Sequence, residues 1–165
     1  MPQKYNPFPF PMIFIIVISV LSLDQLTKFL ILTNLKLHDS VPLVKGVLHL
    51  TLVNNRGAAF GILRNQVPLF ILTSVFAIIM ILLSLKEKKQ KGVSLAGVSL
   101  GLILAGALGN LIDRLCLGYV VDFLDLRIWP VFNLADSAIT VGAVLLGYAI
   151  LMTNDKIQST SYKSQ

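Results

Sequence analysis

Apolar segments long enough to cross a lipid bilayer are the strongest constraint on the fold of this chain. We predict four of them, at about residues 12–32, 67–85, 93–111 and 134–152. As a helix, the first segment would rise roughly 31 Å at ~1.5 Å per residue, about one hydrocarbon thickness. Backbone polar groups inside hydrocarbon must be bonded within the segment, so each is expected to be a helix. The sequence therefore predicts a bundle of four transmembrane helices.

The composition agrees with a membrane protein of one domain over residues 1–165. The chain is 55% hydrophobic and only 13% charged, unlike a soluble globular protein. Its net charge of +6 is attributed to basic residues in loops that face the cytoplasm or anionic lipid. No interleaving of basic and aromatic residues indicates a nucleic-acid partner. With one cysteine and two histidines, neither a disulfide nor a metal or cofactor site is predicted.

The segment between the first two predicted helices has the pattern of a strand. Leu48, Leu50 and Leu52 alternate with His49 and other residues, which is typical of a half-buried strand. Residues 54–57 (NNRG) are interpreted as a turn. We therefore predict an all-α membrane protein with a small extracytoplasmic β-sheet between helices 1 and 2.

Four spans place both chain termini on one side of the membrane, together with the loop after the second span. That short loop contains Lys86, Lys88, Lys89 and Lys91. Because short basic loops near spans remain in the cytoplasm, both termini are predicted to be cytoplasmic. Most of the acidic residues then lie at the extracytoplasmic face, which is where polar chemistry is expected.

Glycine and alanine recur every four residues in the third span, at Gly97, Gly101, Ala105 and Gly109. Small residues at this spacing let another helix approach closely. The fourth span has Ala143 and Gly147 at the same spacing. These residues predict close helix–helix contacts.

The predicted topology brings polar residues from distant segments to one membrane face. They are Asp24, Gln25, Lys28, Asn55, Arg56, Asn110, Asp113, Arg114, Asn133 and Asp136. Ionisable residues at a bilayer cost free energy and are usually functional. A proton-driven transporter would tend to hold such groups near mid-bilayer, whereas this chain holds them at one rim.

Several of these residues also have a structural interpretation. Asp24 and Lys28 can form an i,i+4 pair that eases a helix end out of lipid. Asn133 and Asp136 fit the N-cap and N3 positions of a helix. Asp113, which shares a helical face with Asn110 and Arg114, is interpreted as structural.

Spacing alone does not distinguish the roles of two aspartates near this group. Asp122 and Asp125 follow an apolar triplet and would face opposite sides of an extended segment. One would then face the site and the other solvent, and the pattern does not say which.

Three functions remain open at this point. Two aspartates sharing a site would hold one carboxyl protonated and one ionised, an arrangement that can activate water against a peptide bond. A second possibility is a peptidase that uses Ser137 and Lys28 as a Ser–Lys pair. Thiol and zinc peptidases are not indicated, because Cys116 has no histidine near it in the sequence and there is no H-E-x-x-H motif. A non-enzymatic lipid-binding or transport protein is the third interpretation.

Five blocks resemble bacterial lipoprotein signal peptidase (signal peptidase II), a family of intramembrane aspartic peptidases. The blocks, in order, are LDQLTK at 23–28, NRGAAFG at 55–61, GALGNLIDRL at 106–115, GYVVDFLD at 118–125 and FNLADSAITVG at 132–142. The resemblance implies a four-helix membrane bundle with an extracytoplasmic sheet, in the bacterial cytoplasmic membrane. It also implies diacylglyceryl-modified prolipoproteins as substrates, membrane lipid as a partner and globomycin-type compounds as inhibitors.

The resemblance also assigns roles to residues. It implies that Asp122 and Asp136 are catalytic, with Asp113 a structural companion and Asp125 a bystander. The positions it implies for orienting the substrate or supporting the dyad are Asp24, Asn55, Asn110, Arg114 and Asn133. The N-x-G spacing selects Asn55, and Asn54 stays open as a second contributor.

Overall fold

Four long helices coincide with the predicted spans, and the first residue of the third span, 93, lies outside the described residues. The computed structural model describes residues 10–57, 65–87 and 94–162. Its helices are α1 (Phe10–Asn34), α2 (Val67–Glu87), α3 (Leu95–Cys116) and α4 (Leu134–Tyr162). Over the described residues, four segments are long and apolar enough to cross a membrane: Met12–Asn34, Val67–Lys86, Leu95–Cys116 and Leu134–Thr153. The predicted multi-pass membrane architecture is confirmed.

All four helices extend beyond their predicted ends, and α3 and α4 extend the furthest. The hydroxyl of Ser94 accepts a hydrogen bond from the backbone N–H of Gly97 and caps the start of α3. This helix continues past residue 111 to Cys116, so polar residues predicted at its end lie within its last turns. Likewise, α4 continues past residue 152 to Tyr162. Hydropathy marks the apolar part of a helix and does not mark where its polar end stops.

The sheet has three antiparallel strands rather than a hairpin alone. Its order is β1 (Ser40–Val44), β2 (Leu48–Asn55) and β3 (Val120–Asp125). Placing the sheet wholly between helices 1 and 2 was therefore incomplete, because β3 comes from the segment between α3 and α4. Nearly every residue of β3 is buried, so it lacks the alternation that indicates a half-exposed strand.

The predicted turn at residues 54–57 begins later than expected. Asn54 and Asn55 are the last residues of β2 and pair with Val121 and Val120 of β3. Two asparagines favour a turn locally, but pairing with a buried strand holds both in the sheet.

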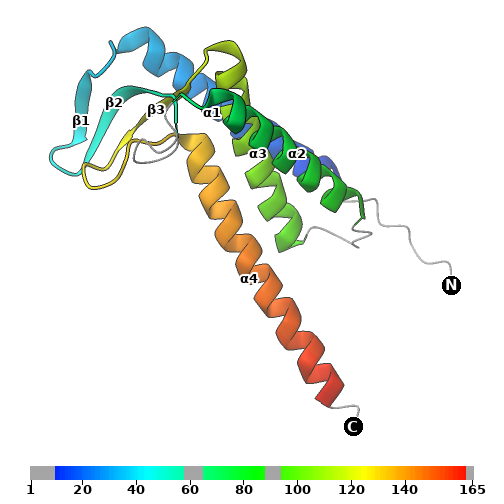
Figure 1. The fold of residues 1–165 in the computed structure, drawn as a ribbon. Coiled ribbons are helices and arrows are strands. Elements are labelled where there is room, and N and C mark those ends of the chain that lie inside the picture. The colour runs from blue at the N-terminus through cyan, green and yellow to red at the C-terminus, as the bar shows by residue number, and fades with distance from the viewer. Residues whose placement is uncertain (1–9, 58–64, 88–93, 163–165) are drawn as a thin grey trace.

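The sheet lies at one end of the helices (Figure 1). At this end α1 and α3 finish and α2 and α4 begin, whereas the start of α1 and the end of α4 lie away from the sheet. Ile31 of α1 packs with Leu52, Val121 and Phe123 in a hydrophobic cluster that joins the sheet to the helices. This cluster fixes β3 against the ends of the helices that carry the polar residues.

Close packing of α3 and α4 depends on glycines, although not on all of the predicted ones. A Cβ atom at Gly106 would overlap the backbone of Ala135, and one at Gly142 would lie 2.8 Å from the carbonyl oxygen of Ser99. Gly97 and Gly101 instead face Ile13 of α1. In α4, the expected role of Ala143 and Gly147 was wrong: Ala143 is exposed, and no described atom lies within 4 Å of the place where a Cβ of Gly147 would be.

These two glycine environments predict opposite effects of alanine. Gly106→Ala would force a methyl group into the backbone of α4, and we expect it to lower the free energy of unfolding by ~1–3 kcal/mol. Gly147→Ala is the matched control, and it should leave stability unchanged or raise it by ~0.5–1 kcal/mol. Thermal unfolding of both variants in one detergent measures the difference. Equal stability of the two variants would contradict the packing described here.

Candidate active site

Asp122 and Asp136 lie on different elements and are connected by two asparagines. Asp122 is in β3, and Asp136 is in the first turn of α4. The amide of Asn133 donates to Asp122 Oδ1 at 2.7 Å, and the amide of Asn110 donates to Asp136 Oδ1 at 2.7 Å. Asn133 Nδ2 also donates to Asn110 Oδ1 at 3.2 Å. The structure thus brings the two aspartates into one hydrogen-bonded network.

Asn133 also has the predicted capping role. Its Oδ1 accepts from the backbone N–H of Asp136 at 2.8 Å, the bond from N-cap to N3 that begins α4. The cap prediction is confirmed, and the same side chain contacts Asp122. Helix capping and contact with the dyad are therefore combined in one residue.

Asn55, rather than Asn54, contacts the site. Asn55 Nδ2 donates to Asp122 Oδ2 at 2.8 Å, and its Oδ1 accepts from the backbone N–H of Gly57 at 2.9 Å. Asn54 Oδ1 is buried and has no hydrogen-bond partner among the described residues. Both carboxylate oxygens of Asp122 thus receive an amide donor, from Asn55 and Asn133.

Asp24, Lys28 and Asp113 form a buried ion cluster beside the asparagines. Lys28 Nζ lies 2.9 Å from Asp24 Oδ2 and 2.9 Å from Asp113 Oδ2. The predicted i,i+4 pair exists, but it does not ease a helix end out of lipid. The helix α1 continues to Asn34, and all three side chains are almost fully buried.

The two carboxylates of this cluster also hold backbone. Asp24 Oδ1 accepts from the N–H of Ala135 at 2.9 Å, and Asp113 Oδ2 accepts from the N–H of Val121 at 3.0 Å. The structural role expected of Asp113 is confirmed, and Asp24 has a similar one. Gln25 donates to both carboxylates and to the carbonyl oxygen of Gly109.

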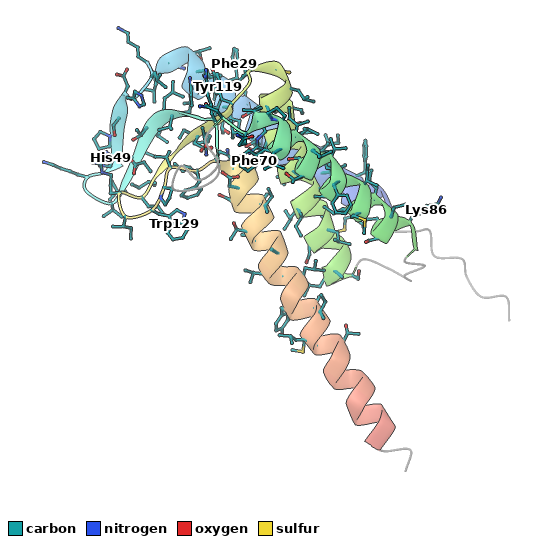
Figure 2. All side chains as sticks on the ribbon, in the orientation of Figure 1. Phe29, His49, Phe70, Lys86, Tyr119 and Trp129 are labelled. Carbon is teal, nitrogen blue, oxygen red and sulfur yellow. The ribbon has the colours of Figure 1, made fainter. Side chains whose placement is uncertain are left out.

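Arg114 is half-buried beside the dyad. Its guanidinium is within electrostatic reach of Asp136, Asp122 and Asp113, and its nearest hydrogen bond is a long one of 3.5 Å to its own helix. The guanidinium lies 5.1 Å from the ring centroid of Phe70, a cation–π contact with the first turn of α2. Figure 2 shows Phe70 at the sheet end of α2. Sequence reasoning missed Phe70, because one phenylalanine in an apolar span carries no signal.

Asp125 lies apart from the dyad, but it does not face solvent as one interpretation expected. It is buried, and it accepts hydrogen bonds from Thr51 and from the backbone and side chain of Arg127. Burial raises the pKa of Asp125, but these hydrogen bonds outweigh that effect and hold the pKa below its ordinary value. Asp125 therefore joins β2 to the loop after β3.

The predicted Ser–Lys alternative has no geometric support. The hydroxyl of Ser137 donates to the backbone carbonyl of Asn133 at 3.0 Å. The three hydrogens of Lys28 are directed to Asp24, Asp113 and Asn110. Lys28 therefore has no hydrogen-bonding capacity left to activate a serine.

Asp122 has an unusual protonation equilibrium for an aspartate. Its side chain is almost fully buried, and burial together with the charge of Asp136 raises its pKa to about 7. Hydrogen bonds from Asn55 and Asn133 and the charge of Lys28 act in the opposite direction. A carboxyl that exchanges its proton near neutral pH is suited to acid–base chemistry.

The fold and site together define a polytopic membrane protein whose buried polar residues converge on two carboxyl groups. Residues 16–152 match the family model described as signal peptidase (SPase) II. The chain belongs to this family, and it is a peptidase.

Similar proteins agree over most of their lengths. The lipoprotein signal peptidase of Halothermothrix orenii is 52% identical over 82% of this chain and 92% of that protein. The lipoprotein signal peptidase of Moorella thermoacetica is 49% identical over 84% and 91%. A bacterial membrane enzyme solved by the in meso method at 2.3 Å resolution is 33% identical, with a TM-score of 0.87 over 93% of this chain and 96% of that one.

The raised pKa of Asp122 predicts how stability depends on pH. An unfolded aspartate has a pKa near 3.8, whereas native Asp122 keeps its proton up to about pH 7, so the native state binds more protons in this window. The free energy of unfolding should therefore fall as the pH rises from about 4 to about 7, and Asp122→Asn should remove this part of the slope. Thermal unfolding of wild type and variant over a pH series measures it. An identical slope in both proteins contradicts the raised pKa.

Proposed function

We propose that this peptidase removes the signal peptide from diacylglyceryl-modified prolipoproteins, with Asp122 and Asp136 activating the attacking water. The single observation that carries the proposal is the joint attachment of both carboxyl groups to the paired amides of Asn110 and Asn133. Membership of the signal peptidase II family and the similarity to lipoprotein signal peptidases support the substrate class.

The two aspartates have different roles because their surroundings differ. Asp122, with a pKa of about 7, is the protonated member near neutral pH. Asp136 is the ionised member in the first turn of α4, where the helix dipole favours negative charge. Asp136 takes a proton from water as the water oxygen attacks the scissile carbonyl carbon, and Asp122 donates its proton to the carbonyl oxygen.

Collapse of the tetrahedral intermediate restores both groups. Asp136 gives its proton to the leaving nitrogen, and Asp122 takes back a proton from the intermediate as the C–N bond breaks. The protons balance, and each aspartate ends in its starting state. The amides of Asn55 and Asn133 hold Asp122 in position throughout.

Arg114 is proposed to orient the substrate. It is half-buried near both aspartates, and its hydrogen bond within the described part of the chain is a long one of 3.5 Å to the carbonyl oxygen of Asn110. Phe70 supports the guanidinium plane from one side. A guanidinium has five N–H donors, so an arginine next to the dyad is suited to bind substrate carbonyl oxygens.

The site is proposed to lie at the extracytoplasmic face of the bacterial cytoplasmic membrane, with both termini cytoplasmic. Lys86 lies at the end of α2 away from the sheet (Figure 2), and the other lysines of the basic loop follow it in the sequence. Basic residues mark the cytoplasmic side, so the sheet and the dyad face the other side. Apolar side chains exposed on the helices contact membrane lipid in this arrangement, and globomycin-type inhibitors are expected to occupy the site.

Removing either carboxyl group should abolish cleavage. Asp122→Asn and Asp136→Asn leave nearly the same volume but cannot transfer the protons, so we expect a loss of at least ~10³-fold in kcat. Asp125→Asn is the matched control and should retain activity, since Asp125 contacts Thr51 and Arg127 away from the dyad. Cleavage of a diacylglyceryl-modified precursor, followed by its length on a gel, measures all three.

The same assay separates the alternatives. Substantial activity in either dyad variant would exclude the aspartic mechanism. Loss of activity in Ser137→Ala with retention in Asp122→Asn would instead favour a serine nucleophile. A wild-type chain that binds the precursor without shortening it would indicate a lipid-binding protein.

A further inference from the structure

Lys28 uses all of its hydrogen-bonding capacity inside the protein. Its ammonium lies 2.9 Å from Asp24 Oδ2, 2.9 Å from Asp113 Oδ2 and 3.2 Å from Asn110 Oδ1, and the residue is 2% exposed. An ammonium has three hydrogens, and the three acceptors come from two helices, α1 and α3. The group therefore does not contact substrate, and any effect on the reaction must pass through its three partners.

Two of these partners hold the backbone beside the dyad. Asp113 accepts from the N–H of Val121, the residue that precedes Asp122. Asp24 accepts from the N–H of Ala135, the residue that precedes Asp136. One ammonium between these two carboxylates thus connects the strand that carries one aspartate to the helix that carries the other.

The third partner sets the orientation of an amide. Asn110 Oδ1 faces the ammonium, so Asn110 Nδ2 faces Asp136, to which it donates at 2.7 Å. A flipped amide would direct N–H groups at the ammonium and leave Asp136 without this donor. The same Oδ1 accepts from Asn133 Nδ2, whose Oδ1 then receives the N–H of Asp136. Lys28 therefore fixes the direction of the hydrogen bonds to the dyad.

We propose that Lys28 is a positioning residue of the peptidase, which holds Asp122 and Asp136 at one separation and fixes the amide donors that face them. This inference rests on the proposed function. It assigns to a buried lysine, without contact to substrate, control over the rate of the chemical step.

Lys28→Met tests the inference, because methionine fills most of the volume and lacks both the charge and the three donors. Without the ammonium, Asp24 and Asp113 face each other unpaired, and the amide of Asn110 is free to turn. A displacement of catalytic groups by about 1 Å costs roughly 100-fold in rate. In the full chain with a diacylglyceryl-modified precursor, we expect kcat to fall about 100-fold and KM to change less than about threefold.

Lys86→Met is the matched control, since Lys86 is exposed at the other end of α2. It should retain the kcat and KM of the wild type. The loss of kcat without loss of binding in Lys28→Met, and in that variant alone, is the expected result.

The pH profile provides a readout that a merely structural role would not change. The groups that face Asp122 from neighbouring elements are Asp136, Lys28, Arg114, Asn55 and Asn133. The charge of Lys28 lowers the pKa of Asp122, so its removal should move the alkaline limb of kcat to higher pH. A Lys28→Met protein with the wild-type kcat and pH profile would overturn the inference.

Lys28→Arg keeps the test decisive if the methionine variant does not fold. Arginine keeps the charge, but its planar guanidinium cannot replace the compact ammonium between two carboxylates and an amide oxygen. We expect a folded protein with kcat at least about tenfold lower. If Lys28 only neutralises charge, Lys28→Arg should be fully active, and that result would refute the positioning role.

The dyad variants separate this inference from the proposed function. If Asp122→Asn and Asp136→Asn are inactive while both Lys28 variants are fully active, the positioning role fails and the function stands. Cleavage by Asp122→Asn would instead exclude the aspartic mechanism of the proposed function, and failure of the wild type to shorten the precursor would overturn the function itself.

Discussion

Two buried carboxylates and one buried ammonium hold the sheet end of this protein together. Asp24, Lys28 and Asp113 are each at most 3% exposed, and a buried charge without a partner costs several kcal/mol. Here both carboxylates contact the one ammonium, and they also accept hydrogen bonds from backbone N–H groups of β3 and α4. Asp24 accepts an N–H of the first turn of α4, where the helix dipole favours negative charge. Removing Lys28 would leave both carboxylates without a counter-charge, so the two ion pairs depend on one ammonium.

This cluster depends in turn on close backbone packing. A Cβ at Gly109 would lie 2.5 Å from Asp24 Oδ2 and 3.3 Å from the Cβ of Ala135. Gly106, one turn earlier in α3, faces the backbone of Ala135. The glycines therefore let α3 approach the start of α4 closely enough for Asp24 to reach the N–H of Ala135. Van der Waals packing and the polar network cannot be separated at this point of the fold.

Features that depend on neighbours in sequence could be predicted. The spans follow from runs of apolar residues, the shared face of Asn110, Asp113 and Arg114 from helical periodicity, and the Asn133 cap from its spacing to Asp136. Contacts between residues that are distant in the chain could not be predicted from the sequence. Membership of β3 in the sheet requires its pairing with β2, and the contact of Phe70 with Arg114 joins two helices.

The different roles of Asp122 and Asp125 also depend on contacts between distant segments. Three residues apart in one strand, they face different partners, Asn55 and Asn133 for the first and Thr51 and Arg127 for the second. The register of β2 against β3 shifts between Leu50 and Val53, the part of β2 that lies between the contacts of the two aspartates. Alternation along the chain predicts that the two differ, but only the pairing partner identifies which one meets Asn133. In the sequence, only the resemblance to the family selected Asp122 over Asp125. In the structure, Asp122 is the one that shares a hydrogen-bond network with Asp136.

Mounting one aspartate on a strand and the other on a helix gives two like groups unlike surroundings. The middle of β3 is dry, and Asp122 there is 1% exposed, so burial outweighs the amide hydrogen bonds that favour its ionised form. The start of α4 is partly open and has the positive end of a helix dipole. A protonated carboxyl is favoured in the first place and an ionised one in the second. A pair on one rigid element would share one environment, whereas here the difference is built into the fold, and the ion cluster around Lys28 keeps the two elements at a fixed distance.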